Sequence, residues 1–173
     1  TAQKHILNFL NLDDLQDRTF LDIGCGSGIN SLAAFLAGAE KIISFDVDAD
    51  SVEAAMKLRE SVGNPEHWVI THGSVLDADF MRSIESADIV YSWGVLHHTG
   101  EMWRAIENSA IPLKEDGVLY IALYSTEVYQ NPSPEYWIDL KRKYNQATAE
   151  EKEEMELTYA WDDVLKNVAL NGD

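Results

Sequence analysis

The sequence predicts an α/β fold, in which a mostly parallel sheet lies between two layers of helices as a three-layer α/β/α sandwich. Five short apolar runs rich in β-branched and aromatic residues alternate with segments of helical periodicity. Strands that alternate with helices at this interval form βαβ units and a parallel sheet. A glycine-rich turn also joins the first apolar run to the helical segment that follows it.

The five predicted strands are nearly continuous apolar runs, which is typical of parallel strands covered on both faces. They span residues 19–23, 41–45, 67–71, 87–93 and 117–124. We find no strand-like run after Tyr124.

Apolar residues at helical spacing mark the segments around the first three strands. A helix before the first strand would bury Ile6, Leu7, Leu10 and Leu15. The next would bury Ile29, Leu32, Ala33 and Leu36 and end at Gly38, a residue suited to the position after a helix. For the third, Asp50 and Glu53 indicate a variant capping box, and the buried face would hold Val52, Ala55 and Met56.

The pattern changes after the last strand, so we divide the chain into a domain of residues 1–125 and an acidic helical extension of residues 126–173. Ser133 and Pro134 mark a helix start. The extension is expected to pack on the first domain or to form part of a substrate cap. Its aromatic residues, which fit a cap or ordinary packing of a terminal helix pair, are Trp137, Tyr144, Tyr159 and Trp161.

Length, charge and cysteine content restrict the function further. The chain has 173 residues and a net charge of -17, which disfavours nucleic acid as a partner, and its basic run 141–143 fits a solvated helix face. Cys25 is the single cysteine, so we expect no disulfide, no metal site and a cytoplasmic location. No apolar run long enough for a transmembrane helix occurs, and no signal peptide is recognised. Because the chain begins with Thr1 instead of Met, we expect a piece of a longer protein.

The glycine-rich turn carries the functional argument. Asp22 lies at the end of the first strand, and Gly24, Gly26 and Gly28 follow it. Glycines allow a tight turn and let a ligand approach the backbone, and the helix that follows offers free N–H groups. Gly-x-Gly alone is weak evidence, whereas Gly-x-Gly-x-Gly with an acid two residues earlier at the first strand is much stronger.

The spacing of this turn favours a nucleoside over a dinucleotide. A dinucleotide-binding turn has the pattern Gly-x-Gly-x-x-Gly, and Ile29 occupies the position of its third glycine. A phosphate-binding loop of the Gly-Lys-Ser/Thr type is also absent. Asp46 ends the second strand, where an acid can accept hydrogen bonds from both ribose hydroxyls. The sequence therefore predicts recognition of a ribose without recognition of a phosphate.

These motifs resemble the class I S-adenosylmethionine-dependent methyltransferases, in particular small-molecule enzymes with a Val-Leu-His-His segment. The resemblance covers about residues 15–125 and implies a Rossmann-like sheet of strand order 3-2-1-4-5. Two further strands that normally finish this sheet in the family are not found, so they either lie beyond Asp173 or are replaced by the terminal helices. The resemblance rests on 22–28, Asp46, 73–77, 92–98 and 113–119. In that family the turn at 24–28 contacts the methionine part, and the acid at 46 binds the ribose. Ser74 stands where the family often has an aspartate for the adenine, so Ser74 or Asp77 would take that role.

The resemblance implies S-adenosylmethionine as cofactor and S-adenosylhomocysteine as product. The cofactor-binding residues that we expect are Asp22, Gly24, Cys25, Gly26, Gly28, Asp46, Val47, Ser74, Val75, Asp77 and Trp93. The backbone near Trp93 would meet the amino group of the ligand. Methyl transfer mainly needs alignment of the nucleophile with the methyl group, so a strong catalytic constellation is not expected.

Each of these residues also has a simpler interpretation. Cys25 could be a nucleophile, but a small residue in the cofactor loop is the more ordinary role. Asp22 could only orient the loop, and Asp46 could only cap a helix. His97 and His98 could act as general base, contact the substrate or shape the loop; a metal site is disfavoured because no third ligand is evident.

The hypothesis is therefore an S-adenosylmethionine-dependent methyltransferase that acts on a small molecule. The alternatives are a non-catalytic S-adenosylmethionine-binding or interaction module and, less favoured, a nicotinamide-dependent oxidoreductase. The identity of the acceptor, its reacting atom and the oligomeric state do not follow from the sequence.

Overall fold

The computed structural model describes residues 1–125 and 133–159, and two compact units divide the chain at Tyr124. The first unit holds a five-stranded sheet of order β3-β2-β1-β4-β5 in which every neighbouring pair is parallel. Its strands are β1 (Thr19–Ile23), β2 (Lys41–Asp46), β3 (Trp68–His72), β4 (Ala87–Trp93) and β5 (Leu113–Ala122). This topology confirms the predicted Rossmann-like sheet and its order.

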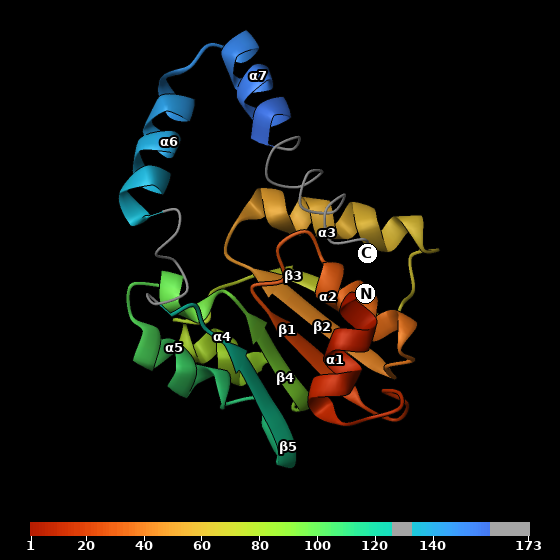
Figure 1. Cartoon of the computed structure of the whole chain (residues 1–173). Coiled ribbons are helices and arrows are strands. Elements are labelled where there is room, and N and C mark those ends of the chain that lie inside the picture. The colour runs from red at the N-terminus through yellow and green to blue at the C-terminus, as the bar shows by residue number, and fades with distance from the viewer. Residues whose placement is uncertain (126–132, 160–173) are drawn as a thin grey trace. The chain divides into compact units, whose positions relative to one another are not determined.

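Helices cover both faces of this sheet (Figure 1). Those of the first unit are α1 (Ala2–Leu10), α2 (Ile29–Leu36), α3 (Ala49–Ser61), α4 (Ala78–Ser83), the short 3₁₀ helix η1 (Leu96–His98) and α5 (Met102–Ser109). No helix in the described parts of the chain is long and apolar enough to cross a membrane.

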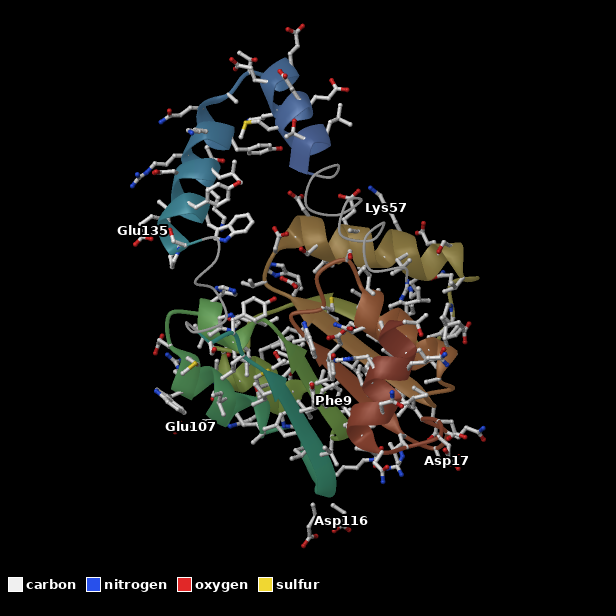
Figure 2. All side chains as sticks on the ribbon, in the orientation of Figure 1. Phe9, Asp17, Lys57, Glu107, Asp116 and Glu135 are labelled. Carbon is white, nitrogen blue, oxygen red and sulfur yellow. The ribbon has the colours of Figure 1, made fainter. Side chains whose placement is uncertain are left out.

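Two separate clusters of buried residues form the core, one on each face of the sheet. Phe20 and Leu21 of β1 illustrate why, because consecutive side chains of a strand point to opposite faces. Phe20 packs in the cluster that includes residues of α1, α2 and α3, and Leu21 in the cluster that includes residues of α4, η1 and α5. Charged side chains such as Lys57, Glu107 and Asp116 point outward (Figure 2).

Several predicted details of the helices are wrong. The cap of α3 is Asp48, whose carboxylate accepts hydrogen bonds from the Ser51 amide and hydroxyl, so Asp50 and Glu53 form no capping box. In α2, the predicted core residues Ile29 and Leu36 are exposed.

The buried face of α2 is instead Ser31, Ala33 and Ala34. These small side chains let the helix lie close to the sheet, which the apolar pattern alone did not indicate. In α3, Val52 and Ala55 are buried as predicted, whereas Met56 is 37% exposed.

Three strands differ from their predicted bounds. The second only extends one residue further, to Asp46. The third begins and ends one residue later than predicted, at Trp68 and His72. The last begins at Leu113, because its first residues pair with β4 across an irregularity near Ala87. The residues after Leu113 are the charged Lys114, Glu115 and Asp116, so the apolar pattern marked only the later part of the strand, which ends at Ala122, two residues before its predicted end.

The second unit contains two described helices, α6 (Pro134–Gln146) and α7 (Ala149–Tyr159). Ser133 caps α6 and Pro134 is in its first turn, as predicted. An apolar groove between the two helices is lined in part by Trp137, Leu140 and Met155. Trp161 and the side chain of Tyr159 fall outside the described residues, and the expected capping role of the extension stays a prediction.

Candidate functional site

The predicted site residues gather where parallel strands end in the first unit. Asp22, Asp46 and Trp93 lie at or next to the last residues of β1, β2 and β4. In the pairing register, Ile23 lies opposite Phe45 and Asp22 opposite Tyr91, so these three strand ends are adjacent. An open parallel sheet binds its ligands outside the carboxyl ends of its strands.

The glycine-rich turn takes its shape from positive backbone angles. Gly24, Gly26 and Gly28 have φ values of 71°, 52° and 86°, which residues with a side chain rarely adopt. A Cβ on Gly24 would lie 2.5 Å from a methyl carbon of Val95, so this glycine also makes room for the segment after β4. The turn thus requires glycine for its conformation and, at residue 24, for its packing.

Asp22 is buried below this turn and belongs to a chain of polar side chains. Its carboxylate accepts a hydrogen bond of 2.6 Å from the Ser31 hydroxyl, which lies 2.8 Å from the Ser44 hydroxyl. The indole N–H of Trp68 donates to Ser44 at 3.0 Å. Because Ser31 gives its proton to the carboxylate, Ser44 is left to donate to Ser31, and every donor points toward Asp22.

Burial raises the pKa of Asp22 from its ordinary 3.8 to about 6, although the hydrogen bonds from Ser31 lower it. The nearby Asp46 carboxylate raises it further. A buried carboxylate of this kind is stabilised by a cation placed beside it.

Asp46 connects the glycine-rich turn with the segment that follows β2. One carboxylate oxygen accepts from the Gly26 amide at 2.8 Å, and the other accepts from the Asp48 amide at 3.0 Å. Each oxygen retains capacity for a further hydrogen bond. The next residue, Val47, exposes 66% of its apolar side chain, and its carbonyl lies 2.9 Å from the His72 ring. The Asp46 carboxylate and the exposed apolar side chain of Val47 therefore lie next to each other in the chain.

Cys25 belongs to the core, although it lies within the glycine-rich turn. Its side chain is buried in the core cluster of α1, α2 and α3, and its amide donates to the Phe45 carbonyl. Burial, together with the charges of Asp22 and Asp46, raises the pKa of the thiol to about 12. A thiol that holds its proton is a poor nucleophile, so the structure favours a packing role for this side chain.

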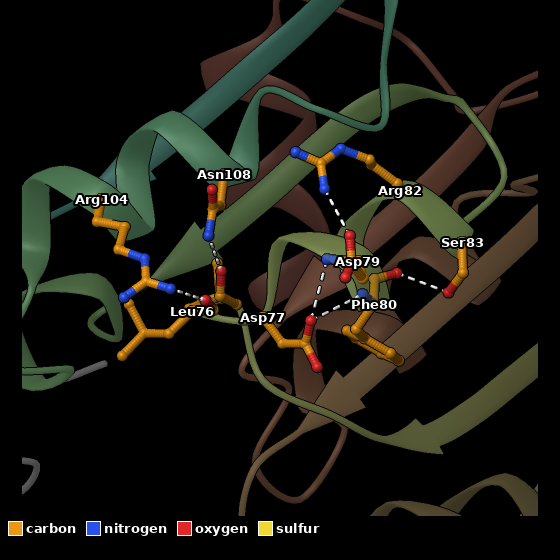
Figure 3. A network of polar contacts seen from close by, with 9 residues as sticks. Leu76, Asp77, Asp79, Phe80, Arg82, Ser83, Arg104 and Asn108 are labelled. Carbon is orange, nitrogen blue, oxygen red and sulfur yellow. Dashed lines mark hydrogen bonds and ion pairs between the residues drawn. The ribbon is translucent and has the colours of Figure 1, made fainter.

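The segment after β3 bears the residues predicted to lie near an adenine. Val75 is buried, Ser74 is half-buried and Asp77 is exposed. The Asp77 carboxylate accepts from the amides of Asp79 and Phe80 and so caps α4. The Ser74 hydroxyl accepts from the Leu76 amide at 3.2 Å. Figure 3 shows Asp77 at the start of α4, with side chains of α5 reaching toward the same segment.

The turn after β4 carries the two predicted histidines. His97 is half-buried, and neither of its ring nitrogens has a hydrogen-bond partner although both are buried. Burial and the neighbouring His98 lower its pKa. The ring of His97 lies 3.9 Å from that of His98 and 4.7 Å from that of Tyr124, measured between centroids. His98 is exposed, so the two neighbours occupy different environments.

Two aromatic contacts beside this turn involve residues that sequence reasoning missed. The ring of His5 in α1 meets the ring of Trp93 edge to face at 4.6 Å, and its Nε2 is buried without a hydrogen-bond partner. A Cβ on Gly94 would lie 2.6 Å from the Tyr124 hydroxyl. No local pattern marks His5, which reaches this place through the packing of α1, whereas Tyr124 was placed at the end of the fifth predicted strand but not among the site residues.

Comparisons with known proteins agree with this geometry. Residues 21–121, more than half of the chain, match the model of a family described as a methyltransferase domain. The chain belongs to this methyltransferase family. The resemblance noted from the motifs is thereby confirmed.

The matches to individual relatives cover part of this chain and part of each relative. The ribosomal protein L11 methyltransferase of Colwellia psychrerythraea is 50% identical over 50 residues, which is 29% of this chain and 17% of that protein. The ubiquinone biosynthesis O-methyltransferase of Glaesserella parasuis is 33% identical over 131 residues, or 68% and 53% of the two lengths. The chain thus spans about half the length, or less, of these two relatives.

Solved structures share the fold of the methyltransferase domain at low identity. The YcgJ protein of Bacillus subtilis matches with a TM-score of 0.61 and 21% identity, over 89% of this chain and 65% of that one. A putative sarcosine dimethylglycine methyltransferase of Galdieria sulphuraria matches with a TM-score of 0.57 and 19% identity, over 69% and 44%.

Gly24 offers a first test of the glycine-rich turn in this methyltransferase domain. Gly24→Ala is expected to lower the free energy of unfolding by about 3 kcal/mol, because strain at positive φ adds to the clash with Val95. Gly26→Ala is the matched control: its φ is also positive, but nothing lies within 4 Å of its Cβ, so a loss of about 1 kcal/mol is expected. Urea unfolding measures both, and equal losses would show that the contact with Val95 is unimportant.

Proposed function

We propose that this chain binds S-adenosylmethionine and transfers its methyl group to a small-molecule acceptor. The observation that carries the proposal is Asp46, a carboxylate at the end of β2 that is hydrogen-bonded to the Gly26 amide of the glycine-rich turn. A ribose held by this acid lies beside a turn that admits close approach of a ligand.

The remaining residues fit the parts of this cofactor. Asp22 offers a buried carboxylate to the ammonium group, and the exposed Val47 offers an apolar surface to the adenine. Ile29 replaces the glycine that a dinucleotide pyrophosphate would need. When bound, the cofactor supplies a methyl group on a positively charged sulfur, so the protein mainly has to align the acceptor and exclude water.

The acceptor is proposed to be a small molecule, as the sequence predicted. The net charge of -17 disfavours nucleic acid. The names of the relatives point to two kinds of acceptor: one is a methyltransferase of ribosomal protein L11, and the other is an O-methyltransferase of ubiquinone biosynthesis. A cytoplasmic location also stays a prediction.

Calorimetric titration tests the cofactor. The chain is expected to bind S-adenosylmethionine and S-adenosylhomocysteine and to leave NAD unbound. Transfer of a labelled methyl group to a panel of small phenols, amines and thiols, with ribosomal protein L11 in parallel, then tests the acceptor. A folded chain that binds neither S-adenosyl ligand would contradict the proposal, and binding without transfer to any acceptor would favour the non-catalytic module.

Of the two histidines, we assign the role of general base to His97, whose ring nitrogens are buried and unpaired. An acceptor that loses a proton during attack would give it to this imidazole, whose lowered pKa keeps it neutral at pH 7. His97→Gln is expected to lower kcat by about 100-fold while the Kd of S-adenosylhomocysteine stays within about twofold.

The exposed neighbour provides the control for His97. His98→Gln is expected to change kcat by less than about threefold, since His98 is exposed and only packs beside His97. With the unsubstituted chain, kcat should be constant from neutral to alkaline pH and fall in acidic buffer, because His97 gains a proton there. If both variants lose the same activity, or if kcat rises in acid, His97 is not the base.

A further inference from the structure

The segment between β3 and α4, residues 73–77, is fixed at both ends by hydrogen bonds of its own. At its start the Gly73 amide donates to the Asp46 carbonyl at 3.0 Å. At its end Asp77 caps α4. Between these points the carbonyls of Val75 and Leu76 accept hydrogen bonds from side chains of α5, a helix about 30 residues later in the sequence.

Two residues of α5 make these bonds (Figure 3). The Asn108 amide donates to the Val75 carbonyl at 2.8 Å, and the Arg104 guanidinium donates to the Leu76 carbonyl at 3.0 Å. They are four residues apart and therefore share one face of the helix. Asn108 is 8% exposed, whereas Arg104 is exposed and also pairs with Glu101.

Because Asn108 is buried, its hydrogen bond constrains the conformation of residues 73–77 more strongly than the exposed bond of Arg104. A buried carbonyl that loses its donor is left without any hydrogen-bond partner, whereas an exposed carbonyl can accept one from water instead. Val75 is itself buried in the core cluster that contains Ala105 of α5. The conformation of the segment therefore depends on a side chain outside it.

The position of residues 73–77 relates this bond to the cofactor. Because the Gly73 amide is bonded to the Asp46 carbonyl, the segment starts beside the acid proposed to hold the ribose. The glycine-rich turn lies on the other side of Asp46, at the end of β1. If the amino-acid part of the cofactor lies at that turn, the base extends from the ribose toward β3 and residues 73–77.

We propose that Asn108 is a positioning residue for recognition of the adenine base, with Arg104 as a second, weaker support. Asn108 holds the backbone so that the polar groups of Ser74 and Asp77 face the edge of the base. The proposal rests on the proposed function, since it presumes that this edge of the sheet binds an S-adenosyl ligand.

The test compares two ligands that differ only at the edge of the base: S-adenosylhomocysteine and S-inosylhomocysteine, in which a carbonyl replaces the amino group. The unsubstituted chain should prefer the adenine ligand by about tenfold or more, the value of one well-placed hydrogen bond. Asn108→Ala should weaken binding of the adenine ligand about tenfold and of the inosine ligand less than threefold, so that the preference is lost.

Two further variants make the result interpretable. Ser109→Ala is the matched control, because this buried hydroxyl of the same helix donates to the Ala105 carbonyl and does not reach the segment. It should leave both Kd values within about twofold. Arg104→Gln removes an exposed side chain and should reduce the adenine preference about threefold. If Asn108→Ala fails to fold, Arg104→Gln alone tests whether side chains of α5 position the segment.

The outcomes separate the two levels of the argument. If the unsubstituted chain binds neither ligand, the proposed function fails and the role of Asn108 fails with it. If that chain prefers adenine, but Asn108→Ala and Arg104→Gln weaken both ligands by equal factors, the proposed function survives and the positioning role is wrong. A chain that binds both ligands equally does not read the edge of the base, which also overturns the inference.

Discussion

Asp46→Ala is expected to raise the Kd of S-adenosylhomocysteine at least about 100-fold, because two hydrogen bonds to a charged acceptor disappear. The substitution also frees the Gly26 and Asp48 amides, which the carboxylate holds at 2.8 and 3.0 Å. Ribose binding and the shape of the glycine-rich turn are therefore lost together. Calorimetric titration measures the change, with circular dichroism as the check on folding.

Two variants separate these contributions. Asp46→Asn keeps one oxygen that can accept from the Gly26 amide, so binding should fall less than in Asp46→Ala. Asp50→Ala removes an exposed acid of the first turn of α3 and should leave the Kd within about twofold. Equal losses in Asp46→Ala and Asp50→Ala would mean that only the negative charge of this region matters and that the ribose lies elsewhere.

The prediction of the fold succeeded where a pattern is local and periodic. The bounds of β1 and β4 were predicted to the residue, since each is a short apolar run of a strand buried between two helical layers. The errors concerned the cap of α3, where two acids compete for the same hydrogen bonds, and the buried face of α2, where the size of the side chains decides which residues are buried. Asp48 caps α3 although Asp50 is equally acidic, because only Asp48 precedes the first helical residue. Small residues, and not Ile29 or Leu36, form the buried face of α2.

The site could be predicted from the sequence only where its residues adjoin a strand end. Asp22 and Asp46 end neighbouring parallel strands, so the topology brings them together, as the effect of Asp46 on the pKa of Asp22 reflects. Ser31, His5 and Asn108 carry no such mark. Each belongs to a helix, and its partner is set by how that helix packs on the sheet. The roles assigned to all these residues stay predictions until ligand binding is measured.

Asp22→Asn is expected to stabilise the chain at pH 8 by about 3 kcal/mol relative to its effect at pH 3. The pKa of Asp22 is 3.8 ordinarily and about 6 in the fold, so the folded chain holds this proton more tightly than the unfolded chain. Its contribution to stability is therefore fully present below pH 3.8 and is lost as the pH rises through 6. Urea unfolding of both proteins at several pH values measures the difference between their free energies of unfolding. A difference that does not change with pH would show that the carboxylate is not desolvated in the fold.

The same substitution should weaken binding of S-adenosylhomocysteine at least about 30-fold at pH 8, because the ammonium group loses its buried counter-charge. For the unsubstituted chain, affinity should fall as the pH drops below 6, since Asp22 is then protonated. Asp22→Asn should lack this pH dependence.

Ser31→Ala keeps the carboxylate but removes the hydroxyl that lowers its pKa, so its affinity should start to fall at a higher pH. A chain that gains stability in Asp22→Asn yet keeps its affinity would place the ammonium group away from Asp22, because a carboxylate that contacts the ligand cannot be neutralised without loss of binding.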